Sequence, residues 1–108
     1  MFKIGVDATN INRFINKKTS FINRVLSTQE LAEYNQITDQ NLKTKFLARA
    51  WAIKESIYKI DNSYIDFRNI DLVKKNNIWE FKNFCISITY VDNLVISVAI
   101  SKEKNEKI

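Results

Sequence analysis

This sequence of 108 residues contains no histidine, no proline, one cysteine and one glycine. Without histidine, a catalytic Ser-His or Cys-His pair is excluded. The single thiol, Cys85, excludes an internal disulfide and a zinc site built from several cysteines, and its place in an apolar run predicts a small buried side chain. Because glycine and proline are so scarce, most turns have to rely on asparagine, aspartate and serine.

The sequence also lacks an apolar run of the ~18 residues that a membrane span requires, and it lacks the apolar core of a signal peptide. We therefore expect a cytoplasmic protein. Hydrophobic residues make up 45% and aromatic residues 12% of the chain, which predicts a folded globule. The length predicts one domain over residues 1–108.

Acidic residues are absent from residues 8–29, although the segment contains four bases: Arg13, Lys17, Lys18 and Arg24. This segment supplies most of the net charge of +5. A localised basic surface indicates an acidic partner, which could be nucleic acid, a membrane surface or an acidic protein.

The first half of the chain predicts one strand followed by helices. Phe2, Ile4 and Val6 alternate with more polar residues, which predicts a strand with one buried face. Helical periodicity and capping residues predict helices over about residues 11–15, 20–26, 28–37 and 41–60. Ser27 and Glu30 have the spacing of a capping box, so they should start the third of these helices.

The second half of the chain changes to a period of two. Strands are expected over residues 65–74, 78–81, 84–90 and 94–101. Short connections favour antiparallel neighbours. We therefore expect an α+β fold, in which a long helix and shorter helices pack on a mainly antiparallel sheet.

The most informative segment is WAIKESIYK at residues 51–59. Trp51, Glu55 and Lys59 are four residues apart and share one stripe of the long helix. Asp7 closes the first strand. Two such carboxylates predict a site for Mg²⁺, which takes one or two carboxylates, several waters and the phosphate oxygens of a substrate. This combination indicates phosphate-transfer chemistry, although Glu55 and Lys59 alone could be an ordinary surface pair.

Gly5-Val6-Asp7 followed by Trp51-Ala-Ile-Lys54-Glu55-Ser-Ile-Tyr-Lys59 resembles the 4′-phosphopantetheinyl transferases. Within that family, the chain is most similar to the short bacterial holo-[acyl-carrier-protein] synthases. The resemblance covers nearly the whole chain, and residues 21–27 and 87–89 are similar to further family segments.

The resemblance implies that phosphopantetheine is transferred from coenzyme A to a serine of apo-acyl carrier protein, with release of 3′,5′-ADP. It implies Mg²⁺ held by Asp7 and Glu55. Glu55, or a water that it orients, would accept the serine proton, and Lys59 would contact phosphate. The residues that it implies for coenzyme A binding are Trp51, Lys54, Lys59, Ser87 and Tyr90. Short family members form homotrimers with active sites at subunit boundaries.

The basic segment then has a candidate partner, because acyl carrier proteins are strongly acidic. Arg13, Lys17 and Arg24 would form a charged rim around the apolar anchors Phe14 and Phe21.

Three positions depart from the family pattern. Tyr90 stands where the family has histidine, residues 61–64 replace a glycine-rich turn, and Ala50 replaces an arginine. These departures keep open a trimeric protein that binds coenzyme A and carrier protein without catalysis. A small basic RNA-binding module is a further alternative.

Overall fold

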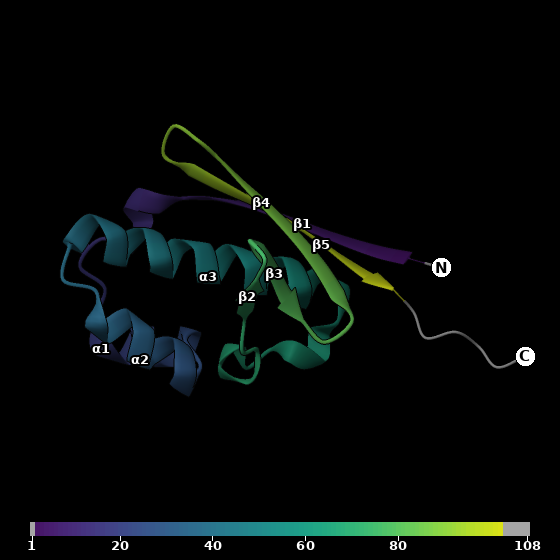
Figure 1. Ribbon diagram of the computed structural model, residues 1–108, viewed down its shortest axis with the longest axis horizontal. Helices are drawn as coiled ribbons and strands as arrows, with labels where there is room; N and C mark the ends of the chain where they lie inside the picture. Colours follow the sequence, from purple (N-terminus) through teal and green to yellow (C-terminus); the bar gives the residue numbers. More distant parts are fainter. Residues whose placement is uncertain (1, 103–108) are drawn as a thin grey trace, which may run out of the picture.

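The computed structural model describes residues 2–102, which form a sheet with a long helix packed along one of its faces (Figure 1). The strands are β1 (Phe2–Asn10), β2 (Val73–Lys75), β3 (Ile78–Phe81), β4 (Phe84–Val91) and β5 (Leu94–Lys102). Their order is β1-β5-β4-β3-β2, and every neighbouring pair is antiparallel. The helices are α1 (Thr19–Val25), α2 (Thr28–Gln36) and α3 (Gln40–Ile60). The predicted α+β class is confirmed.

Side-chain caps begin α2 and α3, whereas α1 has no side-chain cap. At the start of α2, Glu30 N donates to Ser27 Oγ at 3.2 Å and Ser27 N donates to Glu30 Oε1 at 2.9 Å, which confirms the capping box. Asp39 caps α3 by accepting a hydrogen bond from Leu42 N at 3.1 Å. The first predicted helix is a single 3₁₀ turn, Ile11–Phe14. Among the described residues, none of the helices is long and apolar enough to cross a membrane.

The close approach of β1 to α3 depends on Gly5. A Cβ at this position would lie inside van der Waals distance of the Ser56 carbonyl oxygen, so no larger residue fits without moving the strand. Behind it, Ser56 Oγ and Ser97 Oγ are 2.9 Å apart and join α3 to β5. This contact sets Asp7, two residues along β1, beside the last turns of α3.

The outer sheet face, which turns away from α3, is apolar and uncovered in the single chain. It carries Phe2, Ile4, Val6, Cys85, Ile96, Val98 and Ile100. The side chains of Phe2, Ile4 and Val6 were predicted to be buried but are 60%, 64% and 48% exposed. Cys85 is likewise exposed, which corrects the predicted burial. The alternation of apolar and polar residues in β1 identifies two faces, but it does not say which face meets the helix. Here Gly5 decides the orientation, because only a residue without Cβ fits against Ser56 of α3.

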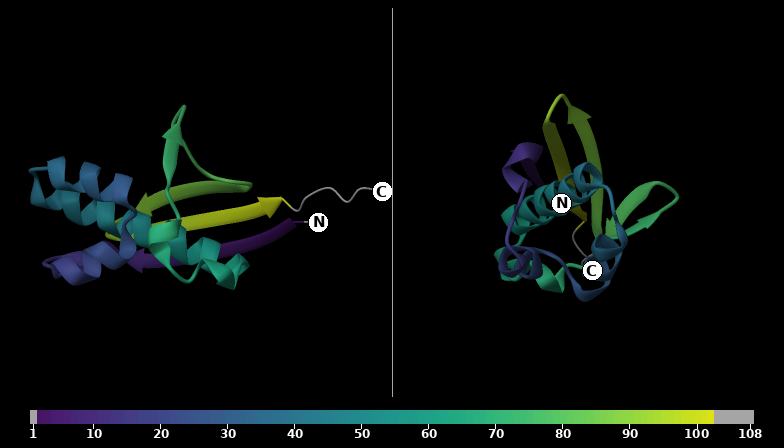
Figure 2. Two further views of the ribbon diagram at one scale, coloured as in Figure 1. Left: turned by 90° about the horizontal axis from the view of Figure 1, so that it is seen from below. Right: turned by 90° about the vertical axis from the view of Figure 1, so that its left-hand side faces the viewer.

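The predicted strand over residues 65–74 is wrong for most of its length. Two 3₁₀ turns, Asn62–Tyr64 and Phe67–Asn69, precede the short β2. Asp61 Oδ1 accepts from Ser63 N, and Asp66 Oδ1 accepts from Arg68 N. These aspartates bond to their own backbone two residues on, which competes with strand pairing. The β2–β3 hairpin then stands away from the rest of the sheet (Figure 2).

Candidate functional site

The structure brings together Asp7, Glu55 and Lys59, the three residues that the sequence placed at a phosphate-transfer site. Lys59, on the last turn of α3, donates to Val6 O at 2.8 Å and lies 3.4 Å from Asp7 Oδ1. Glu55 lies one turn earlier on the same stripe of the helix. The cluster therefore joins the carboxyl-terminal half of β1 to that of α3.

Glu55 lies in an environment that disfavours its ionised form. Burial, and then the charge of Asp7, raise the pKa of Glu55, while Lys59 and Arg13 oppose the rise. The charge of Asp7 therefore disfavours ionisation of Glu55. A bound cation would relieve this repulsion.

Asp7 Oδ2 is buried and has no hydrogen-bond partner within residues 2–102. A buried carboxylate oxygen without a partner is costly, and a metal ion is one way of satisfying it. The same residues contain no group of three potential metal ligands among His, Cys, Asp and Glu. A site with two carboxylates suits Mg²⁺, which keeps its other positions for water and substrate phosphate. The residues present therefore fit the predicted ion.

An open groove of about 610 Å³ runs beside Glu55 between α1, α3 and the 3₁₀ turn Phe67–Asn69. Its apolar part contains Phe21, Trp51 and Phe67. The ring of Trp51 stacks on Phe21 at 5.7 Å and meets Phe67 edge-on at 5.4 Å. Arg24 and Arg68 add positive charge to the lining. The groove can therefore hold a partly apolar, partly anionic substrate next to the carboxylate cluster.

The basic first segment contributes to this groove only in part. Phe21 and Arg24 line it, and Lys17 Nζ lies 4.7 Å from the centre of the Phe21 ring. Phe14, predicted as an apolar anchor for a partner, is only 3% exposed and packs against Phe21 and Trp51. That prediction is wrong, because the side chain belongs to the core. Arg13 lies over the Phe14 ring and donates to Thr9 Oγ1 at 2.7 Å.

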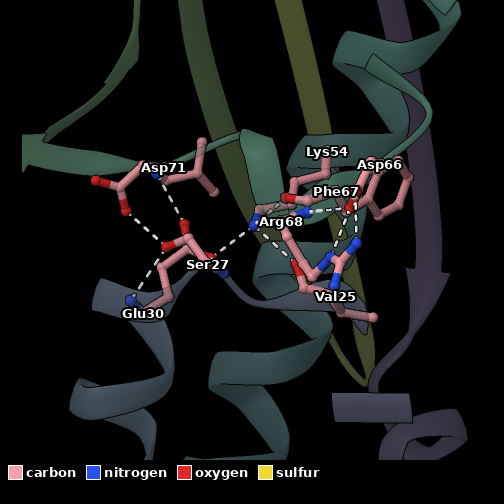
Figure 3. A network of polar contacts seen from close by, with 9 residues as sticks. Val25, Ser27, Glu30, Lys54, Asp66, Phe67, Arg68 and Asp71 are labelled. Atoms are coloured by element: carbon pink, nitrogen blue, oxygen red, sulfur yellow. Dashed lines mark hydrogen bonds and ion pairs between the residues drawn. The ribbon is translucent and has the colours of Figure 1, made fainter. Parts of the chain in front are cut away.

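Lys54, predicted to contact phosphate, points into the protein instead (Figure 3). Its side chain is 0% exposed, and its Nζ donates to Val25 O at 2.8 Å, Phe67 O at 2.9 Å and Glu30 Oε1 at 2.6 Å. Burial lowers the pKa of Lys54 and the Glu30 carboxylate opposes this. Because an ammonium group has three donors and all are used, a phosphate contact does not fit this structure.

Ser87 and Tyr90 do not join the cluster in the described part of one chain. Ser87 pairs with Val98 across β4 and β5 and lies on the outer sheet face. Tyr90 lies on the opposite face, where its hydroxyl accepts from Arg49 Nη1 at 3.4 Å and its ring lies under Lys45. Any role of these residues beside Glu55 would require a second copy of the chain.

The groove also contains residues that sequence reasoning missed. Tyr58 lies three residues after Glu55 on the helix, so the same spacing argument could have found it. Arg68 gives no such signal, because the sequence predicts a strand over its segment. Its guanidinium forms an ion pair with Asp66 at 2.7 Å, and its hydrogen bonds lower the pKa of Asp66 to about 2.

Comparisons with known proteins find similar sequences and a similar fold. The sequence model of the 4′-phosphopantetheinyl transferase superfamily matches residues 3–99. A holo-[acyl-carrier-protein] synthase from Mycoplasma mobile is 47% identical over 103 residues, covering 95% of this chain and 92% of the relative. One from Mycoplasmopsis pulmonis is 38% identical over 97 residues, covering 90% and 87%.

A crystal structure of a holo-(acyl-carrier-protein) synthase from Bacillus anthracis, in complex with CoA (3′,5′-ADP), is also similar. It superposes with a TM-score of 0.79 at 19% identity, covering 94% of this chain and 96% of that one. At this identity the likeness shows a shared fold.

Proposed function

We propose that this chain, which belongs to the 4′-phosphopantetheinyl transferase superfamily as an enzyme of the holo-[acyl-carrier-protein] synthase type, transfers 4′-phosphopantetheine from coenzyme A. The acceptor would be a serine of apo-acyl carrier protein, and the reaction would depend on Mg²⁺. The second product would be 3′,5′-ADP. The observation that supports this most directly is the pairing of Asp7 and Glu55 beside the groove, with one oxygen of Asp7 buried and unpartnered among the described residues.

Asp7 and Glu55 would hold the Mg²⁺ ion. When bound there, the ion would offset the charge of the coenzyme A pyrophosphate and orient it. Glu55, or a water that it orients, would accept the proton of the carrier-protein serine. Glu55 lines the groove, so its carboxylate is accessible to the serine of a docked carrier protein.

Lys59 would bind a phosphate oxygen. Its ammonium group has three donors, and two of them are directed at Val6 O and Asp7 Oδ1. The side chain is 49% exposed, so the remaining donor can reach a ligand. Lys59 would thus link the metal ligand Asp7 to the leaving phosphate of the substrate.

The groove would receive the two substrates. Its aromatic part suits the uncharged arm of phosphopantetheine, and Arg24 with Lys17 suits an acidic carrier protein. Arg13 and Phe21 would support this surface, Arg13 through its charge near Glu55 and Phe21 through its stacking on Trp51. The reaction would place the protein in the cytoplasm, in fatty acid biosynthesis.

The protein would assemble as a homotrimer. The outer sheet face exposes Phe2, Ile4 and Val6 together, and a contiguous apolar surface of this kind is typical of an interface. Association of copies through this face would cover it, and it could bring Ser87 and Tyr90 of one copy toward the groove of another. Tyr90 would then contact coenzyme A at the position where the family has histidine.

The test is the intact mass of apo-acyl carrier protein after incubation with this protein, coenzyme A and Mg²⁺, with EDTA in a parallel sample. A mass gain of one phosphopantetheine group, only with metal, is expected. Folded protein that binds carrier protein without any mass gain would contradict the proposal and favour a binding protein without catalysis. Salt-sensitive binding to random RNA, with none to carrier protein, would favour the RNA-binding alternative.

A further inference from the structure

The buried ammonium group of Lys54 joins the two sides of the groove. Its acceptors include Val25 O, at the end of α1, and Phe67 O, in the 3₁₀ turn that faces α1 across the groove (Figure 3). Both residues line the groove. Lys54 directly precedes Glu55 on α3, so one helix carries both this bridge and the candidate proton acceptor.

Glu30 and Ser27 extend the bridge to the start of α2. Glu30 Oε1 accepts from Lys54 Nζ and from Ser27 N, and Glu30 Oε2 accepts from Leu72 N at 2.7 Å. Ser27 Oγ donates to Asp71 Oδ1 at 2.6 Å. Segment 66–72, of which residues 66–68 line the groove, is therefore held at three points: Phe67 O, Asp71 Oδ1 and Leu72 N.

Segment 66–72 has little regular structure of its own to hold it. It contains one 3₁₀ turn and no strand. Its neighbour across the groove, α1, is a helix of seven residues, too short to be stable without tertiary contacts. The position of each side relative to Glu55 therefore depends on its contacts with α3. Lys54 of α3 makes such a contact with both sides, through Val25 O and Phe67 O.

We propose that Lys54 is a positioning residue for the transfer reaction. It fixes the separation of the two sides of the groove, and thereby the places of Arg24 and Arg68 relative to Glu55. An apolar side chain could fill the same volume, but it could not donate hydrogen bonds to the carbonyl oxygens of two separate segments. The kinetic consequence of this inference rests on the proposed function, whereas its structural consequence does not.

The test uses a double variant that carries both Lys54→Met and Glu30→Gln, and it compares this variant with wild type. Methionine keeps the unbranched shape, and removing the carboxylate charge as well avoids a buried unpaired ion, which is strongly destabilising. Val95→Ala is the matched control, because Val95 is fully buried but lies in β5, outside the groove. Amide hydrogen exchange of residues 62–72 and the KM for carrier protein are measured at temperatures where all three proteins are folded.

A second reporter is the fluorescence of Trp51, which packs between Phe21 and Phe67 from the two sides of the groove. Trp79→Phe in every protein leaves Trp51 as the only tryptophan. In the double variant we expect faster exchange over residues 62–72, a red-shifted Trp51 emission and a KM for carrier protein raised about tenfold, with a smaller change in kcat. The control should lose stability without these three changes.

The inference would be overturned if the double variant had the same amide exchange over residues 62–72 and the same Trp51 emission as wild type. An unchanged KM for carrier protein would also overturn it. If wild type itself transfers nothing, the proposed function is at fault, and exchange together with emission still decides whether Lys54 holds the groove. Should the double variant fail to fold, Asp71→Ala removes only the exposed end of the bridge. This variant should show a smaller increase in exchange over the same segment, and no increase would overturn the inference.

Discussion

Lys59 Nζ lies 3.4 Å from Asp7 Oδ1 although 52 residues separate them in the chain. The pairing exists because β1 runs against the last turns of α3, where Lys59 Nζ also donates to Val6 O of that strand. The candidate metal ligand is thereby fixed to the helix that carries Glu55. Changes that move β1 relative to α3 should consequently affect metal binding and stability together.

Gly5→Ala should therefore damage both the fold and the site. The added methyl group would collide with the Ser56 carbonyl oxygen, a backbone atom that cannot rotate away. We expect a loss of about 1–3 kcal/mol or more in the free energy of unfolding, measured by urea denaturation, and weaker stabilisation by Mg²⁺. Ala8→Ser, at an exposed position of the same strand, should change both quantities little. Equal stabilities for the two variants would contradict the assigned role of Gly5.

Glu55→Gln should leave the fold intact and reduce the transfer rate by about a hundredfold or more, because one change removes a metal ligand and the proton acceptor. Mass spectrometry of the carrier protein gives the rate, and far-UV circular dichroism checks the fold. Glu33→Gln, on the exposed side of α2, is the matched control and should retain wild-type activity. Near-normal transfer by Glu55→Gln would remove Glu55 from the site.

The pH dependence of stability without metal should reveal the raised pKa of Glu55. Folding favours the protonated form, so this contribution to stability is fully present below the ordinary glutamate pKa near 4.5 and is lost as the pH rises through the higher folded-state pKa. Glu55→Gln cannot ionise and should therefore be more stable than wild type at neutral pH. Thermal unfolding across this range, in EDTA, should show a difference that grows with pH. A constant difference would show that Glu55 ionises without penalty.

Arg24→Glu should raise the KM for carrier protein while leaving the KM for coenzyme A nearly unchanged. Arg24 lines the groove and is exposed, so its charge acts on an acidic partner as it approaches. Lys75→Glu makes the same change of charge on the exposed hairpin and should have little effect on either KM. Steady-state rates at low salt give both constants. A similar effect of the two variants would mean that only the net charge matters.

Val6→Asp should dissociate the proposed homotrimer, because it places a charge among the exposed apolar side chains of the outer sheet face. Light scattering after size exclusion gives the molar mass. Ile78→Asp, on the similarly exposed β2–β3 hairpin, should leave the mass of the wild-type assembly unchanged. A monomeric wild-type protein would contradict the proposed trimer, and Ser87 and Tyr90 would then lie outside the site.

Local rules were enough to predict several elements correctly. The capping box of Ser27 and Glu30 depends on side chains three residues apart, and it forms as its pattern requires. The spacing of Glu55 and Lys59 is likewise a property of one helix, so their shared stripe followed without knowledge of the rest. The gathering of these residues with Asp7 was predicted from the chemistry of two carboxylates and from the resemblance to a family, and no local rule supplies it.

Tertiary contacts decided what local patterns leave open. Alternation in β1 defines two faces, but only the packing of Gly5 against Ser56 turned Asp7 toward α3 and left Val6 outside. In the same way, Lys54 and Glu55 are neighbours with similar helical propensities, yet one is buried among carbonyls and the other borders the groove. Residue types and spacings determined which chemistry is available to this chain. Which of those residues meet is decided by long-range packing, because it depends on surfaces formed by segments far apart in sequence.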